Sequence, residues 1–201
     1  SYTALGDSIT YGYTPNTDGV QMDKPYCSAV ADILQLKSSS NLGISGSTLT
    51  DNWYGMAKRI DTIPIKSDII SVFGGTNDWS HNWPLGTIND ADDSTIYGSL
   101  NVICSYLTTN FKDSFVFLIT PYPRRGAGVN SSGYSLYDVR DAFINIGKKY
   151  NFPVLNFTDY GHFQTEINDV NISDGLHPTQ EFVLKYTAPQ IAEFIKDNYK
   201  K

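Results

Sequence analysis

Ser8 stands where a nucleophile could be presented to a substrate. It lies in the string Leu5-Gly6-Asp7-Ser8-Ile9, directly after an apolar run that is typical of a buried β-strand. Gly6 allows the backbone to turn sharply, so the hydroxyl of Ser8 can be exposed at the end of the strand. The same string is also typical of a helix start, in which Asp7 or Ser8 only caps the next turn. Taken alone, the string leaves both interpretations open.

A serine hydroxyl becomes a nucleophile near neutral pH only when a base within hydrogen-bond reach takes its proton. The chain has three histidines, at positions His81, His162 and His177. His177 has a carboxylate three residues before it, Asp174 in the string SDGLHP, and we expect this pair to act together. The glycine and proline of this string favour a bend that brings the carboxylate onto the imidazole and holds the tautomer that a base requires. The alternative interpretation is a surface turn that leads into the last helix.

Two further loops carry groups that can stabilise negative charge. The loop after the expected second strand contains Gly43 and Gly46, and either glycine can expose its backbone N–H at close range. The loop after the expected third strand contains Asn77, whose side-chain amide is a second kind of donor. Acyl transfer needs such donors because the carbonyl oxygen becomes negative in the tetrahedral intermediate. Both loops are also compatible with ordinary turns between a strand and a helix.

Together the four segments resemble the SGNH, or GDSL-like, hydrolase family. The family pattern is a Gly-Asp-Ser block, a glycine block, a Gly-x-Asn-Asp block and a terminal Asp-x-x-His block, and all four occur here in this order. The resemblance implies Ser8 as the nucleophile, His177 as the general base and Asp174 as the residue that orients the base. It also implies an oxyanion hole formed by the backbone N–H groups of Ser8 and Gly46 and the side chain of Asn77.

One position departs from the usual family string, and other catalytic motifs are absent. Ile9 replaces the leucine of Gly-Asp-Ser-Leu, an apolar exchange that should leave the serine chemistry intact. Gly46 fits the family spacing better than Gly43. The chain has no G-x-S-x-G elbow, no H-E-x-x-H and no paired C-x-x-C, so we expect no metal and no other cofactor.

Aromatic residues in or just after the strand-end loops suggest a substrate. Flat rings can stack against sugar faces, and the rings in these loops are Trp53, Tyr54, Trp79, Trp83 and Tyr122, of which we expect Trp53, Trp79, Trp83 and Tyr122 to bind substrate. The alternative is that these rings only pack the loops. Because no long apolar lid segment occurs, we expect a short acyl group, specifically an O-acetyl ester on a carbohydrate. Two other functions stay open: a lysophospholipase or thioesterase of the same family, and a non-catalytic carbohydrate-binding or adhesion module on this fold.

The elements that must position these residues follow from hydrophobic periodicity. Short apolar runs alternate with segments of helical period, which predicts an α/β fold with a parallel sheet. We expect a flavodoxin-like, three-layer α/β/α sandwich of about five strands in a single domain, 1–201, with three strands apolar enough to be central. In such folds the carboxyl ends of the strands form the ligand crevice. The expected strands are 2–5, 39–42, 68–73, 115–120 and 154–157; the expected helices are 26–34, 97–111, 136–150 and 181–199, with Pro189 interrupting the last.

Charge and composition restrict the partners. The formal net charge is −6 and the 15 Lys and Arg residues are scattered, so we expect no nucleic-acid partner. No apolar run is long enough to span a bilayer. Cys27 and Cys104 lie in apolar helical patterns typical of buried free thiols, and a disulfide between them stays open. Oligomeric state is not indicated.

The start of the sequence bears on where the protein is located. The chain begins at Ser1 rather than Met, and an apolar strand pattern starts at once. We therefore expect that the natural N-terminus has been removed, and that the chain is secreted or extracellular, or a domain excised from a larger extracellular or virion-associated protein.

Overall fold

The structure is a computed structural model that describes residues 1–15, 20–50, 54–160 and 170–199. In this part of the chain a five-stranded sheet has the order β2-β1-β3-β4-β5, with every neighbouring pair parallel. This order confirms the expected flavodoxin-like fold. The strands are β1 (Tyr2–Gly6), β2 (Ser39–Gly43), β3 (Ile69–Phe73), β4 (Phe115–Ile119) and β5 (Val154–Leu155).

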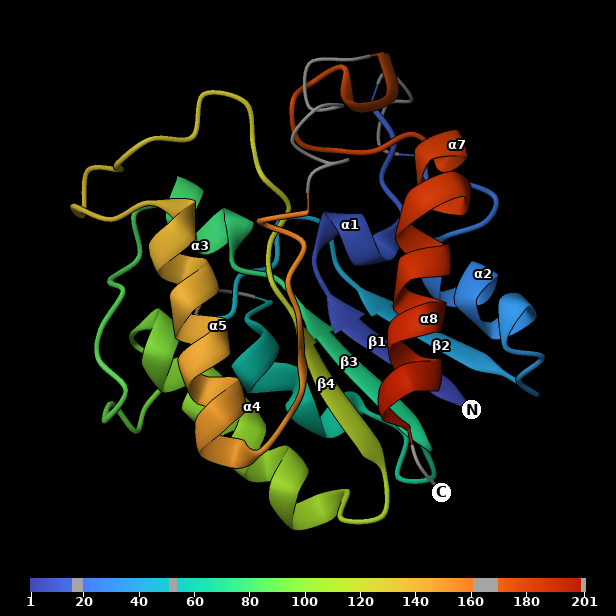
Figure 1. The fold of residues 1–201 in the computed structure, drawn as a ribbon. Helices are drawn as coiled ribbons and strands as arrows, with labels where there is room; N and C mark the ends of the chain where they lie inside the picture. The colour runs from blue at the N-terminus through green and yellow to red at the C-terminus, as the bar shows by residue number, and fades with distance from the viewer. Residues whose placement is uncertain (16–19, 51–53, 161–169, 200–201) are drawn as a thin grey trace.

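Helices cover both faces of the sheet and make the outer two layers of the sandwich (Figure 1). Helices α2 and α8 pack on one face, and η1, α4 and α5 pack on the other. The helices are α1 (Ser8–Tyr11), α2 (Tyr26–Ile33), the 3-10 helix η1 (Met56–Thr62), α3 (Thr76–Ser80), α4 (Ile96–Asn110), α5 (Leu136–Tyr150), the 3-10 turn η2 (Val170–Ile172), α7 (Gln180–Phe182), the π-helical turn η3 (Val183–Thr187) and α8 (Ala188–Asn198).

Two hydrophobic cores lie on opposite faces of the same sheet. Successive side chains of a strand point to opposite faces, so β3 contributes Ile69 and Phe73 to the core under α2 and α8. Ile70 and Val72 of the same strand join the core under α4 and α5. The three central strands are the apolar ones, whereas β2 and β5 at the edges are only half-buried. This agrees with the prediction that three strands are central.

Local signals fix the ends of the long helices. Thr95 accepts a hydrogen bond from the N–H of Gly98 and so caps α4. At the start of α5, Ser135 and Asp138 form a capping box, in which the carboxylate of Asp138 accepts from the backbone N–H of Ser135 at 2.7 Å. Asn151 ends the same helix with a left-handed backbone, φ 57°. These caps explain why both helices begin and end within one residue of the expected bounds.

The C-terminal helix changes its hydrogen bonding just before Pro189. Proline has no N–H and its ring collides with the preceding turn of an α-helix. The chain accommodates it with η3, where the N–H of Ala188 reaches back to the carbonyl of Val183. The backbone stays helical on both sides, so α7, η3 and α8 continue as one rod (Figure 1). The expected interruption is therefore a widened turn.

No helix in the described ranges has the length and hydropathy that crossing a bilayer requires.

Candidate active site

Ser8 is the first residue of α1, immediately beyond the carboxyl end of β1. The side chain of Asp7 caps this short helix, because its Oδ1 accepts the N–H of Ile9 at 2.9 Å. The capping interpretation of the string is therefore correct for Asp7. It does not compete with a chemical role for the neighbouring serine, since the cap holds Ser8 at the helix start with 5% of its surface exposed.

The structure brings together three side chains that the sequence predicted as a unit. The Oγ of Ser8 lies 2.9 Å from Nε2 of His177, although 169 positions separate them in the chain. On the other side of the ring, Nδ1 of His177 lies 2.7 Å from Oδ2 of Asp174. When Nδ1 donates to the carboxylate, Nε2 is left as an acceptor for the serine hydroxyl. The arrangement can therefore draw a proton from Ser8.

The turn that carries His177 is organised by the carboxylate of Asp174. Its Oδ1 accepts the N–H of His177 at 2.7 Å and that of Leu176 at 2.9 Å, while Gly175 takes the left-handed conformation with φ 75°. Burial opposes ionisation of this carboxyl, but the hydrogen bonds from His177 and Leu176 outweigh it, so the pKa of Asp174 is lowered. The carboxylate is thus charged and aimed at the imidazole.

Tyr13 covers the imidazole, a contact that the sequence analysis missed. The ring centroids of Tyr13 and His177 are 4.5 Å apart and the rings are tilted by 52°. The backbone N–H of Tyr13 donates to the carbonyl of Ser8 at 2.9 Å, which ties the segment after α1 to the serine. An aromatic residue five positions after the serine gave no periodic signal of this contact.

The donors expected for an oxyanion hole lie on two loops in contact with each other. The side-chain amide of Asn77, on α3 after β3, donates to the carbonyl of Ser47 at 2.8 Å. Ser47 follows Gly46, which has a left-handed backbone with φ 79°. Within the described residues no hydrogen bond uses the N–H of Gly46 or of Ser8. By contrast, the N–H of Gly43 donates to the side chain of Asn41 at 2.9 Å.

Asp78, to which no role was assigned from the sequence, binds the backbone of the same loop. Its fully buried carboxylate accepts the N–H of Leu49 at 2.9 Å and that of Thr50 at 3.1 Å. Burial raises the pKa of Asp78, and the hydrogen bonds from Leu49 and Thr50 oppose the rise. Its position next to Asn77 in the Gly-x-Asn-Asp block was the available signal.

The aromatic residues predicted to bind substrate differ in how far they are buried. Tyr122 is 1% exposed, with its ring 5.2 Å from that of Phe73 and its hydroxyl 2.6 Å from Thr187. It is a core residue, so the prediction of a substrate contact is wrong here. Trp79 and Trp83 are half-buried, and Trp53 lies outside the described residues.

Trp79 is held by the loop that follows β4. Its indole N–H donates to the carbonyl of Gly128 at 3.2 Å, and the guanidinium of Arg124 lies over its ring, 5.4 Å from the centroid. The residue is therefore near the carboxyl edge of the sheet, but part of its ring is already covered by the protein's own side chain. Its contact with substrate, like that of Trp83, stays a prediction.

A hollow of about 480 Å³ lies between the end of α1 and the loop after β2. Tyr13, whose ring contacts that of His177, is one of its walls, and neither Ser8 nor His177 itself lines the hollow. Tyrosine rings and small loop residues make up the lining: Tyr11, Tyr13, Gly43, Ile44, Ser45 and Tyr54.

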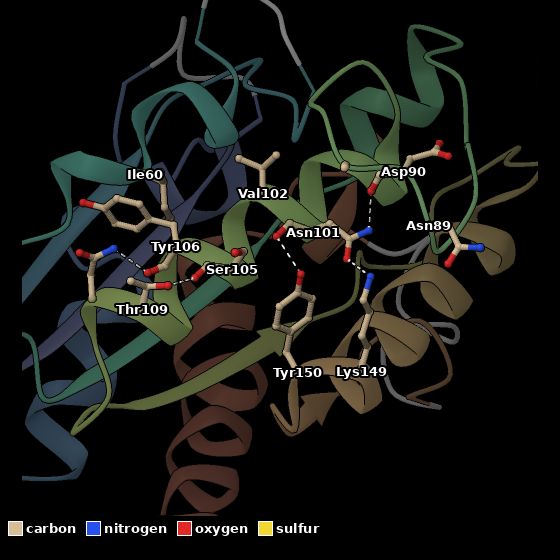
Figure 2. Close-up of a pocket in the computed structure, with 12 residues that line it drawn as sticks. Ile60, Asn89, Asp90, Asn101, Val102, Ser105, Tyr106, Thr109, Lys149 and Tyr150 are labelled. Carbon is tan, nitrogen blue, oxygen red and sulfur yellow. Dashed lines mark hydrogen bonds between the residues drawn. The ribbon is translucent and has the colours of Figure 1, made fainter.

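Another hollow, of about 520 Å³, lies over α4 and α5 and is shown in Figure 2. None of the residues predicted for the site lines it. Its polar groups bind one another: the ammonium of Lys149 donates to Asn101 Oδ1 at 2.8 Å, and Asn101 Nδ2 donates to the carbonyl of Asp90 at 2.7 Å (Figure 2). These contacts link the α4–α5 pair to the segment before α4, which is a structural role.

A serine, a histidine and a carboxylate linked in this way at the carboxyl edge of a parallel sheet form the constellation that serine hydrolases share. A family model for GDSL-like lipases and acylhydrolases matches residues 4–182. The chain belongs to this family and is a hydrolase of the GDSL type.

Solved structures with the same fold cover nearly the whole chain. A protein from Lactobacillus plantarum is 29% identical with a TM-score of 0.86, over 99% of this chain and 97% of that one. A possible lipase from Chitinophaga pinensis is 24% identical with a TM-score of 0.81, over 98% and 97%. A lipase/acylhydrolase from Enterococcus faecalis is 21% identical with a TM-score of 0.71, over 99% and 96%. A comparison with curated protein sequences gives no match.

Proposed function

We propose that the protein is a serine esterase that works through an acyl-enzyme on Ser8. The observation that carries the proposal is the contact of 2.9 Å between Ser8 Oγ and His177 Nε2, with Asp174 on the far side of the ring. A hydroxyl in contact with an imidazole that a carboxylate orients is the arrangement that activates serine for attack on a carbonyl.

The proposed cycle has two halves. Ser8 attacks the ester carbonyl while His177 takes its proton, and the N–H groups of Ser8 and Gly46 with the amide of Asn77 stabilise the oxyanion. His177 then gives the proton to the leaving alcohol, and water repeats the same steps on the acyl-enzyme. The uncommitted N–H of Gly46, compared with the occupied N–H of Gly43, supports the choice of Gly46.

We further propose that the substrate is a short acyl ester, an O-acetyl group on a carbohydrate. The hollow lined by Tyr11, Tyr13 and Tyr54 supports this choice because tyrosine rings can stack on a pyranose and hydroxyl groups can bind its polar edge. A lysophospholipase or thioesterase of the same family would instead prefer a long acyl chain. Rates on acetylated xylan, on p-nitrophenyl acetate and on the palmitate ester separate these functions, and faster release of palmitate than of acetate contradicts the proposal.

The role of Ser8 is tested by Ser8→Ala. The exchange removes the attacking oxygen and leaves the helix cap at Asp7 in place, so we expect a folded protein whose turnover of p-nitrophenyl acetate falls by roughly ten-thousand-fold or more. A fluorophosphonate should label the wild-type chain once and leave the variant unlabelled. Near wild-type turnover in the variant removes Ser8 from the mechanism, and a chain that neither turns over esters nor takes the label is a binding module.

A further inference from the structure

Arg59 ties three segments of the site together through one guanidinium. It lies on η1, outside every block of the family pattern. Its Nη2 donates to the carbonyl of Gly6 at 2.7 Å and to the hydroxyl of Ser47 at 3.2 Å. Nη1 donates to the carbonyl of Leu42 at 2.7 Å, and Nε donates to the carbonyl of Tyr54 at 3.1 Å.

All four acceptors of this cation are uncharged. No carboxylate of the described residues forms a salt bridge with Arg59. Burial lowers the pKa of the guanidinium to about 10, and the nearby charge of Asp7 opposes the fall. Because its hydrogen-bond acceptors are uncharged, Arg59 gains little from ion pairing. Its structural role is therefore to fix the relative positions of these acceptors with a planar, rigid guanidinium.

The fork connects the two chain segments that carry the backbone donors of the proposed oxyanion hole. Gly6 stands two residues before Ser8, and Ser47 stands directly after Gly46. Nη2 therefore bridges the segment that carries the N–H of Ser8 and the segment that carries the N–H of Gly46. The side-chain amide of Asn77 donates to the carbonyl of Ser47 in the same loop. One network of hydrogen bonds therefore links the segments that carry all three proposed donors.

We propose that Arg59 is a positioning residue that sets the spacing of the oxyanion-hole donors. The inference rests on the proposed function, and Arg59 itself touches no reacting atom. The loop of Gly46 needs such a support because it follows the half-buried edge strand β2 and an added Cβ at Gly46 would meet nothing within 4 Å. Packing on this side therefore does not hold Gly46, and the loop depends on hydrogen bonds such as those that Ser47 makes with Arg59 and Asn77. A displacement of about 1 Å at a catalytic group can lower the rate about a hundredfold.

Arg59→Lys tests the fork while keeping the charge. A lysine ammonium cannot bridge four acceptors in one plane, so we expect kcat on p-nitrophenyl acetate to fall about ten- to a hundredfold, with KM changing less than about threefold. The matched control is Arg140→Lys on α5, where the arginine binds Asp159 and Asp141. This control should keep the wild-type kcat, and circular dichroism should show both variants folded.

A tetrahedral adduct separates positioning from a general loss of structure. A phenyl trifluoromethyl ketone forms such an adduct with a nucleophilic serine, so its inhibition constant should rise in Arg59→Lys by about the factor by which kcat/KM falls. Phenol, a product-like ligand that forms no oxyanion, should bind both proteins equally. Added guanidinium chloride at low millimolar concentration should restore part of the activity of Arg59→Ala and none of the activity of Ser8→Ala.

Ser47→Ala gives a second test if the arginine variants do not fold. It removes the hydroxyl that accepts from Nη2 and that donates to the carbonyl of Tyr54 at 2.6 Å, and we expect kcat to fall in the same direction. The losses in the double variant with Arg59→Lys should be less than additive, because Arg59→Lys already breaks the contact between Arg59 and Ser47.

Wild-type kcat and inhibition constant in Arg59→Lys, or in Ser47→Ala where the lysine variant is unfolded, would overturn the inference. Strictly additive losses in the double variant would also overturn it. These failures differ from failure of the proposed function, which requires an active Ser8→Ala. An inactive Ser8→Ala together with a normal Arg59→Lys removes the positioning role and keeps the esterase.

Discussion

At the scale of single residues, Asp174 decides which nitrogen of His177 carries a proton. Its Oδ1 is occupied by two backbone N–H groups, and its Oδ2 faces Nδ1 of the ring. Asp174→Asn can keep the turn through Oδ1 but places an amide N–H against Nδ1. That nitrogen must then accept, Nε2 carries the proton, and the hydroxyl of Ser8 loses its base. We expect kcat to fall by roughly a thousand- to ten-thousand-fold with the fold intact.

The measurement is the pH profile of p-nitrophenyl acetate hydrolysis for the variant and for a surface control. Asp159→Asn is the control, because Asp159 is an exposed partner of Arg140 in the segment that follows the edge strand β5. We expect it to stay within about twofold of the wild type. Equal rates for Asp174→Asn and Asp159→Asn would show that the carboxylate does not orient the base.

Asp7 should make the stability of the protein depend on pH. Burial raises the pKa of Asp7 to about 7; the N–H of Ile9 and the charge of Arg59 oppose the rise, while Asp78 adds to it. The folded state therefore holds this proton more tightly than the unfolded state. Its contribution to stability is complete below the ordinary carboxyl pKa and is lost as the pH rises through about 7. Between pH 5 and 7 the free energy of unfolding should fall by on the order of 1 kcal/mol per pH unit from this group.

Asp7→Asn tests this dependence, because an asparagine keeps the cap on Ile9 and cannot ionise. Urea unfolding at pH 5, 6, 7 and 8 gives the free energy of unfolding for both proteins. The advantage of the wild type over the variant should shrink, or change sign, as the pH increases. Parallel curves for the two proteins would show that Asp7 does not titrate in the fold.

The motif residues could be predicted because each is marked by its neighbours in the chain, and their contacts then follow from the order of the strands. Arg59 could not, since its acceptors are three carbonyl groups and one hydroxyl of residues in other segments, and no local pattern marks them. Tyr122 was misjudged for a related reason. An aromatic residue just after a strand has the same appearance whether the chain then turns outward or folds its ring under Phe73.

At the scale of elements, close contact between α1 and the end of β2 fixes the position of the nucleophile. A Cβ at Gly43 would lie 2.0 Å from the backbone nitrogen of Tyr11 and 2.6 Å from the carbonyl carbon of Thr10. Both atoms belong to backbone, so they cannot rotate away as a side chain could. Gly43→Ala should therefore push α1 off the strand and lower the free energy of unfolding by roughly 2–4 kcal/mol.

Thermal unfolding and esterase activity of Gly43→Ala provide the measurement. Gly128→Ala is the matched control, because a Cβ there meets nothing within 4 Å. The control should change the free energy of unfolding by less than about 0.5 kcal/mol. Activity of Gly43→Ala should fall even where the protein is fully folded, since Ser8 moves with α1. A variant with wild-type stability would contradict this contact.

The central strands β1, β3 and β4 were predicted within one residue of their observed bounds because burial on both faces leaves a nearly continuous apolar run. The edge strand β5 is shorter than expected: it was predicted over 154–157 and is observed as Val154–Leu155. Phe157 was included for its apolarity, but its ring packs against Tyr122 and Phe73 in the core beyond the strand. Apolarity indicates burial, and burial does not require a strand.

At the scale of the whole molecule, one sheet separates two cores, and we propose that residues 1–201 form one domain for this reason. Neither core is complete without the sheet, since β1, β3 and β4 contribute side chains to both. Loss of either helix layer would expose the other face of the same strands. Unfolding should therefore be a single cooperative event.

The two cysteines report on this cooperativity because they lie in different cores. Cys27 is on α2 and Cys104 is on α4, on opposite faces of the sheet, and both are free and buried. The sheet between them rules out the disulfide that the sequence left open. Burial raises the pKa of Cys27 to about 11 and raises that of Cys104 as well, so neither forms the reactive thiolate near neutral pH.

We expect Ellman's reagent to find no reactive thiol in the native protein and both thiols in guanidinium chloride. In intermediate denaturant the two sites should become reactive along one curve that coincides with the loss of helical circular dichroism. Cys27→Ala and Cys104→Ala, each with one thiol left, assign the signals. If Cys27 reacts at a lower denaturant concentration than Cys104, the layer of α2 and α8 opens by itself, and the sheet does not couple the two cores.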